Sequence, residues 1–482
     1  MKGKNRVKKE KRRNEIRIIL NLLRYILIFI ISNIFFLENI SHNFSEAFIC
    51  LLILWGLCIC YCFINLSKRI IYFLFLISFF CFFFGRMFSD LVLFGYVKFY
   101  FTNKIVKHML LSQWIALVFL QIGVEVFEKK KNKGIVVKNK MYKKLLLKYS
   151  EKLFYISSIC SFLLSLEKII FKENNNYVDL YLTFNSNFPK IIQVLGNGYS
   201  ILVLIYFISF PNTKKIKFSI LISIIIAIMK LLTGTRGIAI LDIIIIIIYL
   251  IWRQKITKER WIGKKEIFLA LIMSPVMIIF LSLFSYYREG LEIKNLILKE
   301  QFFRFFKVTG NTVDLLGYGI IYKNNFPQQY YSFGEVIDYI KYNPLISILL
   351  NKSTPLRNTI EYAMNMHSYS HTISYFIIPK LYVLGHGKGS NYIAELYHDF
   401  GYLGVGFFNL ILGYFMVILT RIKVLNILRI ALYFLMVKML IFIPRGSFIT
   451  PLTYSLNSTY LGICILLYIF IKYLISVYVK ER

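Results

Sequence analysis

Two arginines of this sequence occupy glycine-containing turns beside long apolar segments. Arg236 lies between Gly234 and Gly237, and Arg445 precedes Gly446 near the C-terminus. A guanidinium group is permanently charged and planar, and it can bind phosphate oxygens in a bidentate manner. One such arginine could simply reach toward lipid headgroups, but two similar turns far apart in the chain favour phosphate binding. Between them, the long polar segment 286–391 contains three further arginines: Arg288, Arg304 and Arg357.

A glycine run precedes the last apolar part of the chain. Gly385, Gly387 and Gly389 alternate with polar residues, as they do in loops that bind phosphates. However, the run lacks the Gly-Lys-Ser/Thr ending of a nucleotide-binding loop, and no strand is predicted before it. We therefore do not expect a nucleotide site here.

Ionisable residues follow the glycine run at the start of a predicted helix. Glu395, His398 and Asp399 are three to four residues apart or adjacent, so they lie near one helix face. Carboxylates at the membrane are costly and usually serve function, although a structural ion pair with an arginine is the alternative. His367 and His371 precede the run, and either imidazole could act as a base near neutral pH.

Two ionisable residues are predicted inside apolar segments. Lys438 lies seven residues before Arg445, which is about two turns of a helix. Asp242 follows Arg236 in the neighbouring segment, and we interpret it as neutralising a neighbouring arginine. Seven scattered cysteines show neither a disulfide framework nor metal-ligand spacing, so we expect no metal.

The composition indicates a membrane protein. Of 482 residues, 57% are hydrophobic and only 17% are charged, and the mean hydropathy is +0.61. The apolar blocks are long enough to cross a bilayer as helices, and they lack the alternation of barrel strands. The net charge of +35 is spread over short loops between these blocks, which argues against binding of nucleic acid.

Hydropathy predicts an all-α polytopic protein with about twelve transmembrane helices. The predicted spans are 18–37, 44–64, 70–88, 108–127, 153–171, 191–210, 218–232, 238–252, 267–285, 392–419, 430–443 and 460–478. With the N-terminus in the cytoplasm, every inward loop is basic, as the positive-inside rule requires. These loops lie at 68–69, 129–152, 214–217, 253–265, 421–429 and 480–482.

The predicted organisation has four parts. A basic cytoplasmic arm covers residues 1–17, the first nine spans cover 18–285, and the last three cover 392–482. Between them, residues 286–391 form one large extracytoplasmic loop, which is too polar to span and too long for a simple connection. Both termini are expected in the cytoplasm.

The Arg236 turn, the stretch from Ser370 to Gly404 and the Arg445 turn together resemble Wzy-type polymerases of O-antigen and capsular polysaccharide. The resemblance is carried mainly by the C-terminal half of the chain. It implies a bacterial inner-membrane enzyme that transfers a growing glycan from undecaprenyl pyrophosphate to a new lipid-linked repeat unit. It also implies a lipid-linked donor and acceptor, no cofactor, and a possible chain-length regulator as a partner.

On this reading, four arginines would bind the pyrophosphate: Arg236, Arg445, Arg288 and Arg357. Glu395 or His371 would orient or deprotonate the acceptor hydroxyl, and the tyrosine-rich loop would cover the sugars. Two other classes stay open. A flippase for lipid-linked oligosaccharides would spread polar groups through both leaflets, and a polysaccharide ligase would perform similar chemistry on another acceptor.

Overall fold

The computed structural model describes residues 2–128, 140–175, 178–289, 297–342, 355–419 and 426–480. Within these ranges the chain forms helices and short connections, and no strand is present. Ten of the described helices are long and apolar enough to cross a membrane, and a bent pair raises the number to eleven. The prediction of an all-α polytopic membrane protein is therefore confirmed.

The helices of the membrane region are α1 (Lys2–Ile40), α2 (Phe44–Ile64), α3 (Leu66–Phe79), α4 (Gly85–Phe94), α5 (Asn103–Glu128), α6 (Lys140–Asn174), α8 (Lys190–Asn197), α9 (Tyr199–Ile208), α10 (Thr213–Leu232), α11 (Arg236–Thr257), α12 (Lys264–Glu289), α20 (Tyr392–Leu419), α21 (Ile427–Phe442), α22 (Thr450–Ser455) and α23 (Ser458–Lys480). The remaining helices lie in connections: α7 (Asp179–Leu182), α13 (Leu298–Gly310), α14 (Asp314–Ile321), α15 (Gly334–Lys341), α17 (Ile360–Asn365), α18 (Tyr369–Ile377) and α19 (Pro379–Val383).

Twelve spans were predicted, whereas the described residues contain ten apolar candidates, or eleven if the bent pair is one span. α10 coincides with the predicted span at 218–232 and forms a helix of 20 residues, but its four lysines exclude it from the apolar candidates. α8 and α9, which coincide with the predicted span at 191–210, are bent by 51° at a short break. The other ten predicted spans each coincide with an apolar helix.

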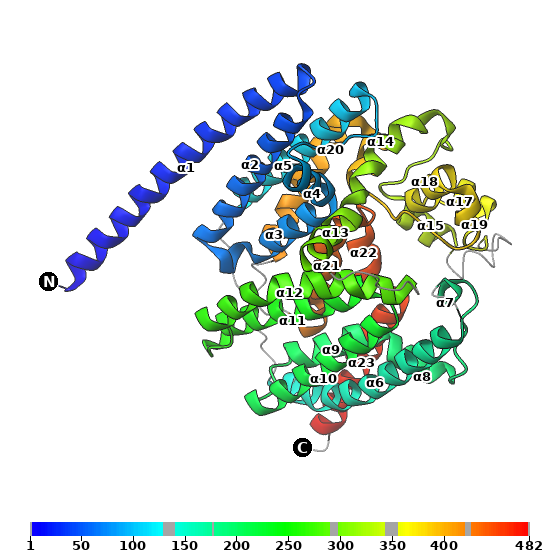
Figure 1. Cartoon of the computed structure of the whole chain (residues 1–482). Helices are drawn as coiled ribbons and strands as arrows, with labels where there is room; N and C mark the ends of the chain where they lie inside the picture. Colours follow the sequence, from blue (N-terminus) through cyan, green and yellow to red (C-terminus); the bar gives the residue numbers. More distant parts are fainter. Residues whose placement is uncertain are drawn as a thin grey trace.

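The first group of helices contains α2, α3, α4, α5 and α20 (Figure 1), in which α3 and α5 pack against α20, and α2 packs against α3 and α5. Gly123 of α5 and Gly413 of α20 let these two backbones touch, because a Cβ at either position would lie within 2.5 Å of a main-chain oxygen of the other helix. Small residues of this kind allow close helix packing in membranes. α1 extends beyond this group as a long single helix (Figure 1).

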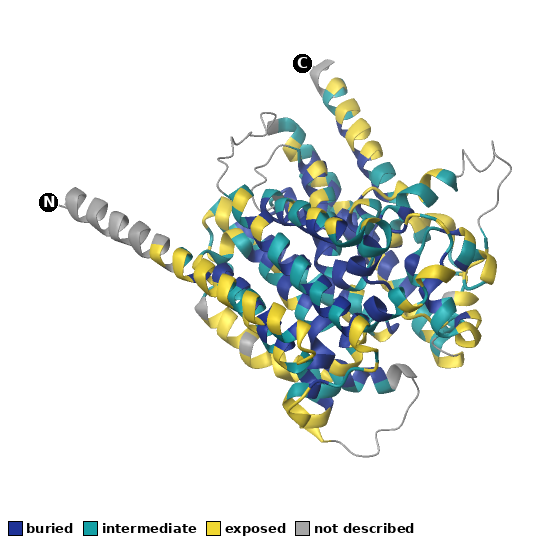
Figure 2. Ribbon diagram, turned by 90° about the horizontal axis from the view of Figure 1, so that it is seen from above, coloured by how far each residue is buried: buried dark blue, intermediate teal, exposed yellow. Residues whose placement is uncertain are grey.

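A second group contains α6, α8, α9, α10, α11, α21 and α23 (Figure 1). Buried residues concentrate along the centre of the molecule, while exposed residues cover the outer faces (Figure 2). Large apolar side chains are exposed on α1, α12 and α23, as expected for helices that face lipid rather than water. α21 lies between the two groups and contacts both α3 and α11.

Helix ends alternate between two sides of the bundle. We call the side that carries α13 to α19 the loop side and the other the basal side. On the basal side, Arg69 pairs with Glu128 and Lys215 pairs with Glu151. On the loop side, Arg445 at the end of α21 reaches Thr312. These contacts join helix ends that lie on the same side of the bundle because successive helices alternate in direction.

The connection between α12 and α20 is largely helical where the structure describes it. α13 packs against α4, and α14 packs against α5 and α20. α15, α17, α18 and α19 form a separate cluster at the edge of the molecule (Figure 1). Residues 290–296 and 343–354 of the predicted large loop lie outside the described ranges.

Candidate functional site

Arg445 lies where three segments of the loop side meet. It is the last residue of the 3-10 helix η4 (Ile443–Arg445), which contains Pro444 and follows α21, and Gly446 comes next. The Arg445 Nη1 donates to Thr312 Oγ1 at 2.8 Å, and the guanidinium carbon is 5.9 Å from the centre of the Phe82 ring. The side chain is half-buried, so its charge is held by protein contacts while part of it faces solvent.

Gly389 brings the glycine run against this guanidinium. A Cβ at Gly389 would lie 3.5 Å from the Arg445 Cζ, and the glycine has φ of +82°. Both the left-handed conformation and the close approach favour glycine over larger residues. The run is therefore a neighbour of Arg445, although the two are more than 50 positions apart in the sequence.

Glu395 connects segments that meet at Arg445. It lies in the first turn of α20 and is 1% exposed. Its Oε1 accepts from the Ser390 hydroxyl, while its Oε2 accepts from the Ser447 hydroxyl at 2.9 Å and the Phe448 N–H at 3.0 Å. The carboxylate thus joins the glycine run to the segment that follows Arg445.

Asn391 completes the junction by capping α20. Its Oδ1 accepts from the backbone N–H groups of Ile393 and Ala394 at 3.0 and 3.1 Å. Its Nδ2 donates to the Thr312 carbonyl at 3.0 Å. Thr312 therefore contacts both Arg445 and the N-terminus of α20, which fixes the short 3-10 helix η2 (Asn311–Val313) in this site.

Arg236 begins α11 after a turn built by its neighbours. The hydroxyls of Thr233 and Thr235 donate to the Lys230 carbonyl at 2.7 and 2.8 Å. Gly234 takes φ of +96°, as the tight turn requires. The Arg236 Nη1 donates to the Leu281 carbonyl of α12 at 3.3 Å.

The structure brings the two arginine turns to neighbouring positions. A Cβ at Gly237 would lie 3.4 Å from the Phe442 ring, and Phe442 precedes Arg445 by three residues. The Phe442 ring is 5.6 Å from the Phe82 ring, which also faces Arg445. A short aromatic layer therefore separates the turns, on the loop side of α11 and α21.

Asp242 lies deeper between the same helices. It pairs with Lys230 of α10 at 2.8 Å and with Lys438 of α21. Asp242 therefore neutralises positive charge, but the predicted arginine partner is wrong, because the carboxylate pairs with two lysines. This three-residue ionic cluster joins α10, α11 and α21.

His371 lies in the separate cluster of α17, α18 and α19. Its Nδ1 is 3.0 Å from the Tyr382 hydroxyl, and its ring centre is 4.5 Å from that of Tyr362. Burial, with the positive charge of Arg357 as a second cause, lowers the pKa of His371 to about 4. The imidazole is therefore neutral near pH 7. His371 and Arg357 thus share a cluster that is distinct from the Arg445 junction.

Of the predicted glycines in the run, Gly387 lies beside this cluster, whereas Gly385 contacts the region of α7. Gly385 has φ of +93° and packs against Val178 and Leu182. Gly387 faces Ser374 of α18, whose hydroxyl accepts from the Lys388 N–H at 2.9 Å. The remaining predicted arginine, Arg288, lies at the end of α12, and its side chain is outside the described part of the structure.

Several functional candidates were not singled out by the sequence reasoning. Arg86 of α4 is 2% exposed and forms an ion pair of 2.7 Å with Asp314. Glu335 of α15 accepts from the hydroxyls of Thr450 and Thr453 at 2.7 and 2.5 Å. An arginine inside a predicted span is itself a recognisable signal, so Arg86 could have been found. Glu335 carries no such signal.

Asp338 and Asp399 are further carboxylates that organise the loop side. Asp338 binds His367 at 2.8 Å, and burial raises its pKa against the opposing effect of that histidine. Asp399, which the sequence analysis placed near Glu395, accepts from the backbone N–H groups of Tyr331 and Ser332 at 2.9 and 2.7 Å. Both carboxylates hold parts of the loop in place.

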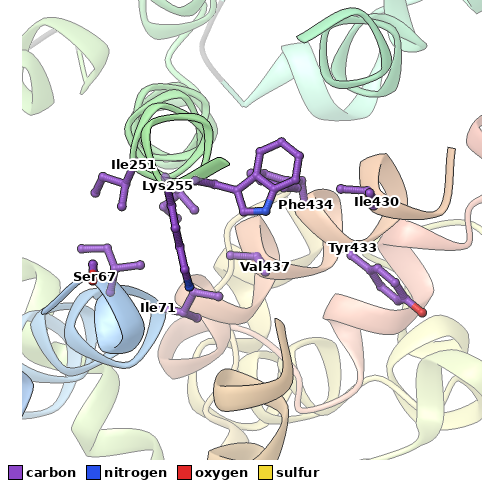
Figure 3. A pocket seen from close by; sticks show the side chains of 11 residues that line it. Ser67, Ile71, Ile251, Lys255, Ile430, Tyr433, Phe434 and Val437 are labelled. Carbon is purple, nitrogen blue, oxygen red and sulfur yellow. The ribbon is translucent and has the colours of Figure 1, made fainter. Parts of the chain in front are cut away.

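Two cavities lie away from this junction. A narrow apolar one of about 40 Å³ lies between α3, α11 and α21, with Ile71, Ile251 and Val437 in its walls and Lys255 at its edge (Figure 3). A larger polar one of about 450 Å³ lies on the basal side, beside the Arg69–Glu128 pair. Among the described residues, no group of three or more His, Cys, Asp or Glu could hold a metal ion.

These features define a polytopic all-α membrane protein with a charged site where its helices meet a large helical connection. The model of one protein family, the O-antigen polysaccharide polymerase Wzy, matches residues 18–476, which is nearly the whole chain. The protein therefore belongs to the Wzy polymerase family, and the resemblance noted in its sequence is confirmed. No curated protein and no solved structure matches it.

Proposed function

We propose that this protein joins undecaprenyl-pyrophosphate-linked oligosaccharide repeat units into a surface polysaccharide, either O-antigen or capsule. The reaction would take place at the outer face of the bacterial inner membrane, with both termini in the cytoplasm. Family membership supports polymerase activity in general. The observation that carries the finer proposal is the position of Arg445, between Thr312 and the glycine run, on the loop side.

Arg445 and Arg236 bind the donor's pyrophosphate in this proposal. Both arginines lie at the loop-side ends of neighbouring helices: Phe442 lies beside Gly237, the residue after Arg236, and Phe82 contacts both Phe442 and the Arg445 guanidinium. Negative charge develops on the pyrophosphate as its bond to the sugar breaks, and fixed cations stabilise that charge most where water is excluded. The leaving group supplies the driving force, so the reaction needs no cofactor.

The other predicted residues take supporting functions. Glu395 positions the glycine run and the segment after Arg445, because its two oxygens accept from both. His371 and Arg357 belong to the outer cluster, where they would contact the glycan or a second phosphate; Arg288 is proposed to contribute from the end of α12. The acceptor is a lipid-linked repeat unit, and a chain-length regulator would bind from outside this site.

The first test compares arginine variants in a strain that lacks the chromosomal gene. Arg445→Ala and Arg236→Ala should leave single lipid-linked repeats and no ladder of longer glycans, because the pyrophosphate is no longer bound. Arg260→Ala is the matched control: it is exposed beyond the basal end of α11 and should give a normal ladder. Membrane levels of each variant are measured by immunoblot.

Three outcomes would contradict the proposal. Full-length polymer from both loop-side variants would exclude the binding of pyrophosphate by these arginines. Loss of all exported repeats in the deletion strain would indicate a flippase. Long lipid-linked polymer that is never transferred would indicate a ligase.

A further inference from the structure

A second carboxylate–arginine pair lies next to the Arg445 junction. Asp314 begins α14, two residues after Thr312, which binds Arg445. Its Oδ1 is 2.7 Å from the Nη2 of Arg86, and its side chain is 19% exposed whereas that of Arg86 is 2% exposed. Asp314 therefore presents a carboxylate at the loop side while its positive partner is buried behind it.

The surrounding backbone holds Arg86 in a fixed position. Gly310 packs directly against the backbone of Arg86, because a Cβ at Gly310 would lie 2.1 Å from the backbone nitrogen of Arg86. In return, a Cβ at Gly85 would lie 2.7 Å from the Phe306 carbonyl oxygen. α4 and α13 are thus in direct backbone contact. A π-helical turn, η1 (Phe80–Phe84), immediately precedes Gly85, and such turns often occur at functional sites.

Charged groups of α4 and the glycine run face Asp314. Arg86 and Asp90 lie one turn apart on α4, and Asp90 is 1% exposed, with neither carboxylate oxygen hydrogen-bonded to a described residue. Lys388 of the glycine run and Tyr318 of α14 also interact electrostatically with Asp314. Burial raises the pKa of Asp314, Arg86 and Lys388 oppose that rise, and Asp90 adds to it.

The glycine run ties this carboxylate to the pyrophosphate site. Lys388 interacts with Asp314, and the next residue, Gly389, contacts the guanidinium of Arg445. Thr312 also connects Arg445 and Asp314, because it binds Arg445 and lies two residues before Asp314 in the chain. A partly exposed carboxylate and a pair of cations are therefore brought together by η2 and residues 388–389.

We propose that Asp314 is the general base that deprotonates the acceptor sugar hydroxyl, with Arg86 as its positioning residue. This inference rests on the proposed polymerase function and goes beyond it, because it assigns the proton transfer to a residue of the large connection. The ligand recognised at Asp314 is thus a sugar hydroxyl of the acceptor repeat unit.

The chemical step balances as a single displacement. The acceptor oxygen forms a bond to the anomeric carbon of the donor, and its proton moves to an Asp314 oxygen. The bond between the anomeric carbon and the phosphate oxygen breaks, and its electron pair leaves with the lipid pyrophosphate. Arg445 and Lys388 stabilise the charge of the leaving group, and Asp314 then releases the proton to water at the loop side.

Asp314 suits this step better than the two groups suggested by the sequence. Glu395 is 1% exposed, and its oxygens already accept three hydrogen bonds. His371 belongs to the outer cluster of α17 to α19. Asp314 combines partial exposure with a fixed cationic partner beside the Arg445 junction.

The test measures transfer by the full-length protein in lipid nanodiscs with a lipid-linked repeat unit as donor and acceptor. Asp314→Asn should lower the rate by about 100-fold or more, which is the usual contribution of a general base, with donor binding unchanged. Asp314→Glu should restore part of the rate. Glu361→Gln is the matched control, because Glu361 is an exposed carboxylate of α17.

A pH profile separates proton transfer from a purely structural effect. The charge of Arg86 opposes the rise in the pKa of Asp314, so Arg86→Gln, which removes that charge, should shift the acidic limb of the rate profile to higher pH. If Asp314→Asn does not accumulate, the charge-neutral double variant Arg86→Gln/Asp314→Asn is used and should fold but not polymerise.

An Asp314→Asn rate within threefold of wild type, or an unshifted acidic limb in Arg86→Gln, would overturn the assignment of Asp314. A polymerising double variant would do the same. The proposed function fails differently: in that case the wild-type protein itself forms no polymer from the lipid-linked repeat.

Discussion

At the scale of single residues, Glu395 shows how a predicted catalytic group can instead join segments. A buried carboxylate needs several donors to offset its lost hydration. Ser390, Ser447 and the Phe448 N–H supply them from two segments that are far apart in the sequence. The position of Glu395 on α20 was predictable from sequence, whereas its three donors were not.

Two substitutions at Glu395 distinguish a positioning function from base catalysis. A glutamine can accept from Ser447 and Phe448 with its oxygen and donate to Ser390 with its nitrogen, so Glu395→Gln should keep at least about a third of the polymerisation rate. A catalytic base would instead lose about 100-fold or more. The rate is measured in nanodiscs.

Glu395→Leu is the contrasting variant. It leaves three donors without an acceptor, and each buried unpaired donor costs about 1–3 kcal/mol. We expect a lower melting temperature and little polymer from this variant. Equal and severe inactivation by the glutamine and leucine variants, with both proteins folded, would show that the carboxylate itself takes part in the reaction.

At the scale of helices, the cluster of α17, α18 and α19 contains a buried imidazole. The pKa of His371 is about 4 in the folded protein and close to 6.5 in an unfolded chain. The unfolded chain therefore binds the proton more readily, so the stability from this group is complete above pH 6.5 and is lost as pH falls toward 4. The difference corresponds to roughly 3 kcal/mol.

Hydrogen exchange at several pH values tests this expectation. After correction for the intrinsic exchange rate at each pH, amides of α17 to α19 should show lower protection at pH 4.5 than at pH 7, whereas the protection of the α5–α20 contact should change little. In His371→Gln the difference between the two pH values should be much smaller, because glutamine does not titrate. Unchanged pH dependence in that variant would assign the effect to another group.

The hydrophobic segments predicted the long helices, but they predicted the ends of these helices less well. The predicted spans at 70–88 and 153–171 are the central parts of longer candidate spans at Leu66–Phe94 and Met141–Asn174. Hydropathy does not detect the π-helical turn η1 or the break at Gly401, where φ is +62° inside α20. Such breaks depend on which neighbouring helix contacts the backbone.

At the scale of the whole molecule, the alternating direction of the helices places the predicted site residues together. Arg236 begins α11 and Arg445 follows α21, and these helices run in opposite directions with the Lys230–Asp242–Lys438 cluster between them. Removing one member of a buried ionic cluster leaves an uncompensated charge. The cluster therefore fixes the depth at which the two turns meet.

Cysteine labelling in spheroplasts tests the orientation. In a variant without native cysteines, an impermeant maleimide should label Cys introduced by His386→Cys, which lies on the loop side and is exposed. It should label Lys258→Cys, at the basal end of α11, only after the membrane is permeabilised. The opposite pattern would place the arginines in the cytoplasm and exclude an extracytoplasmic reaction.

The sequence by itself determined the all-α membrane architecture, the family and the arginine–glycine turns. Long apolar segments have one stable solution in lipid, the helix, because every backbone polar group must be paired within it. The sequence also showed which residues are unusual in a membrane, and Arg236, Arg445 and Glu395 were found in this way.

Only the tertiary structure decided which of these residues lie together. Arg445 meets Thr312 and Gly389, Glu395 bridges two loops, and Asp314 pairs with Arg86 across more than 220 positions of sequence. Such pairings depend on how helices pack, through small residues such as Gly85 and Gly310 that let backbones touch. Hydropathy and local spacing contain no information about that packing, since both describe only neighbours along the chain.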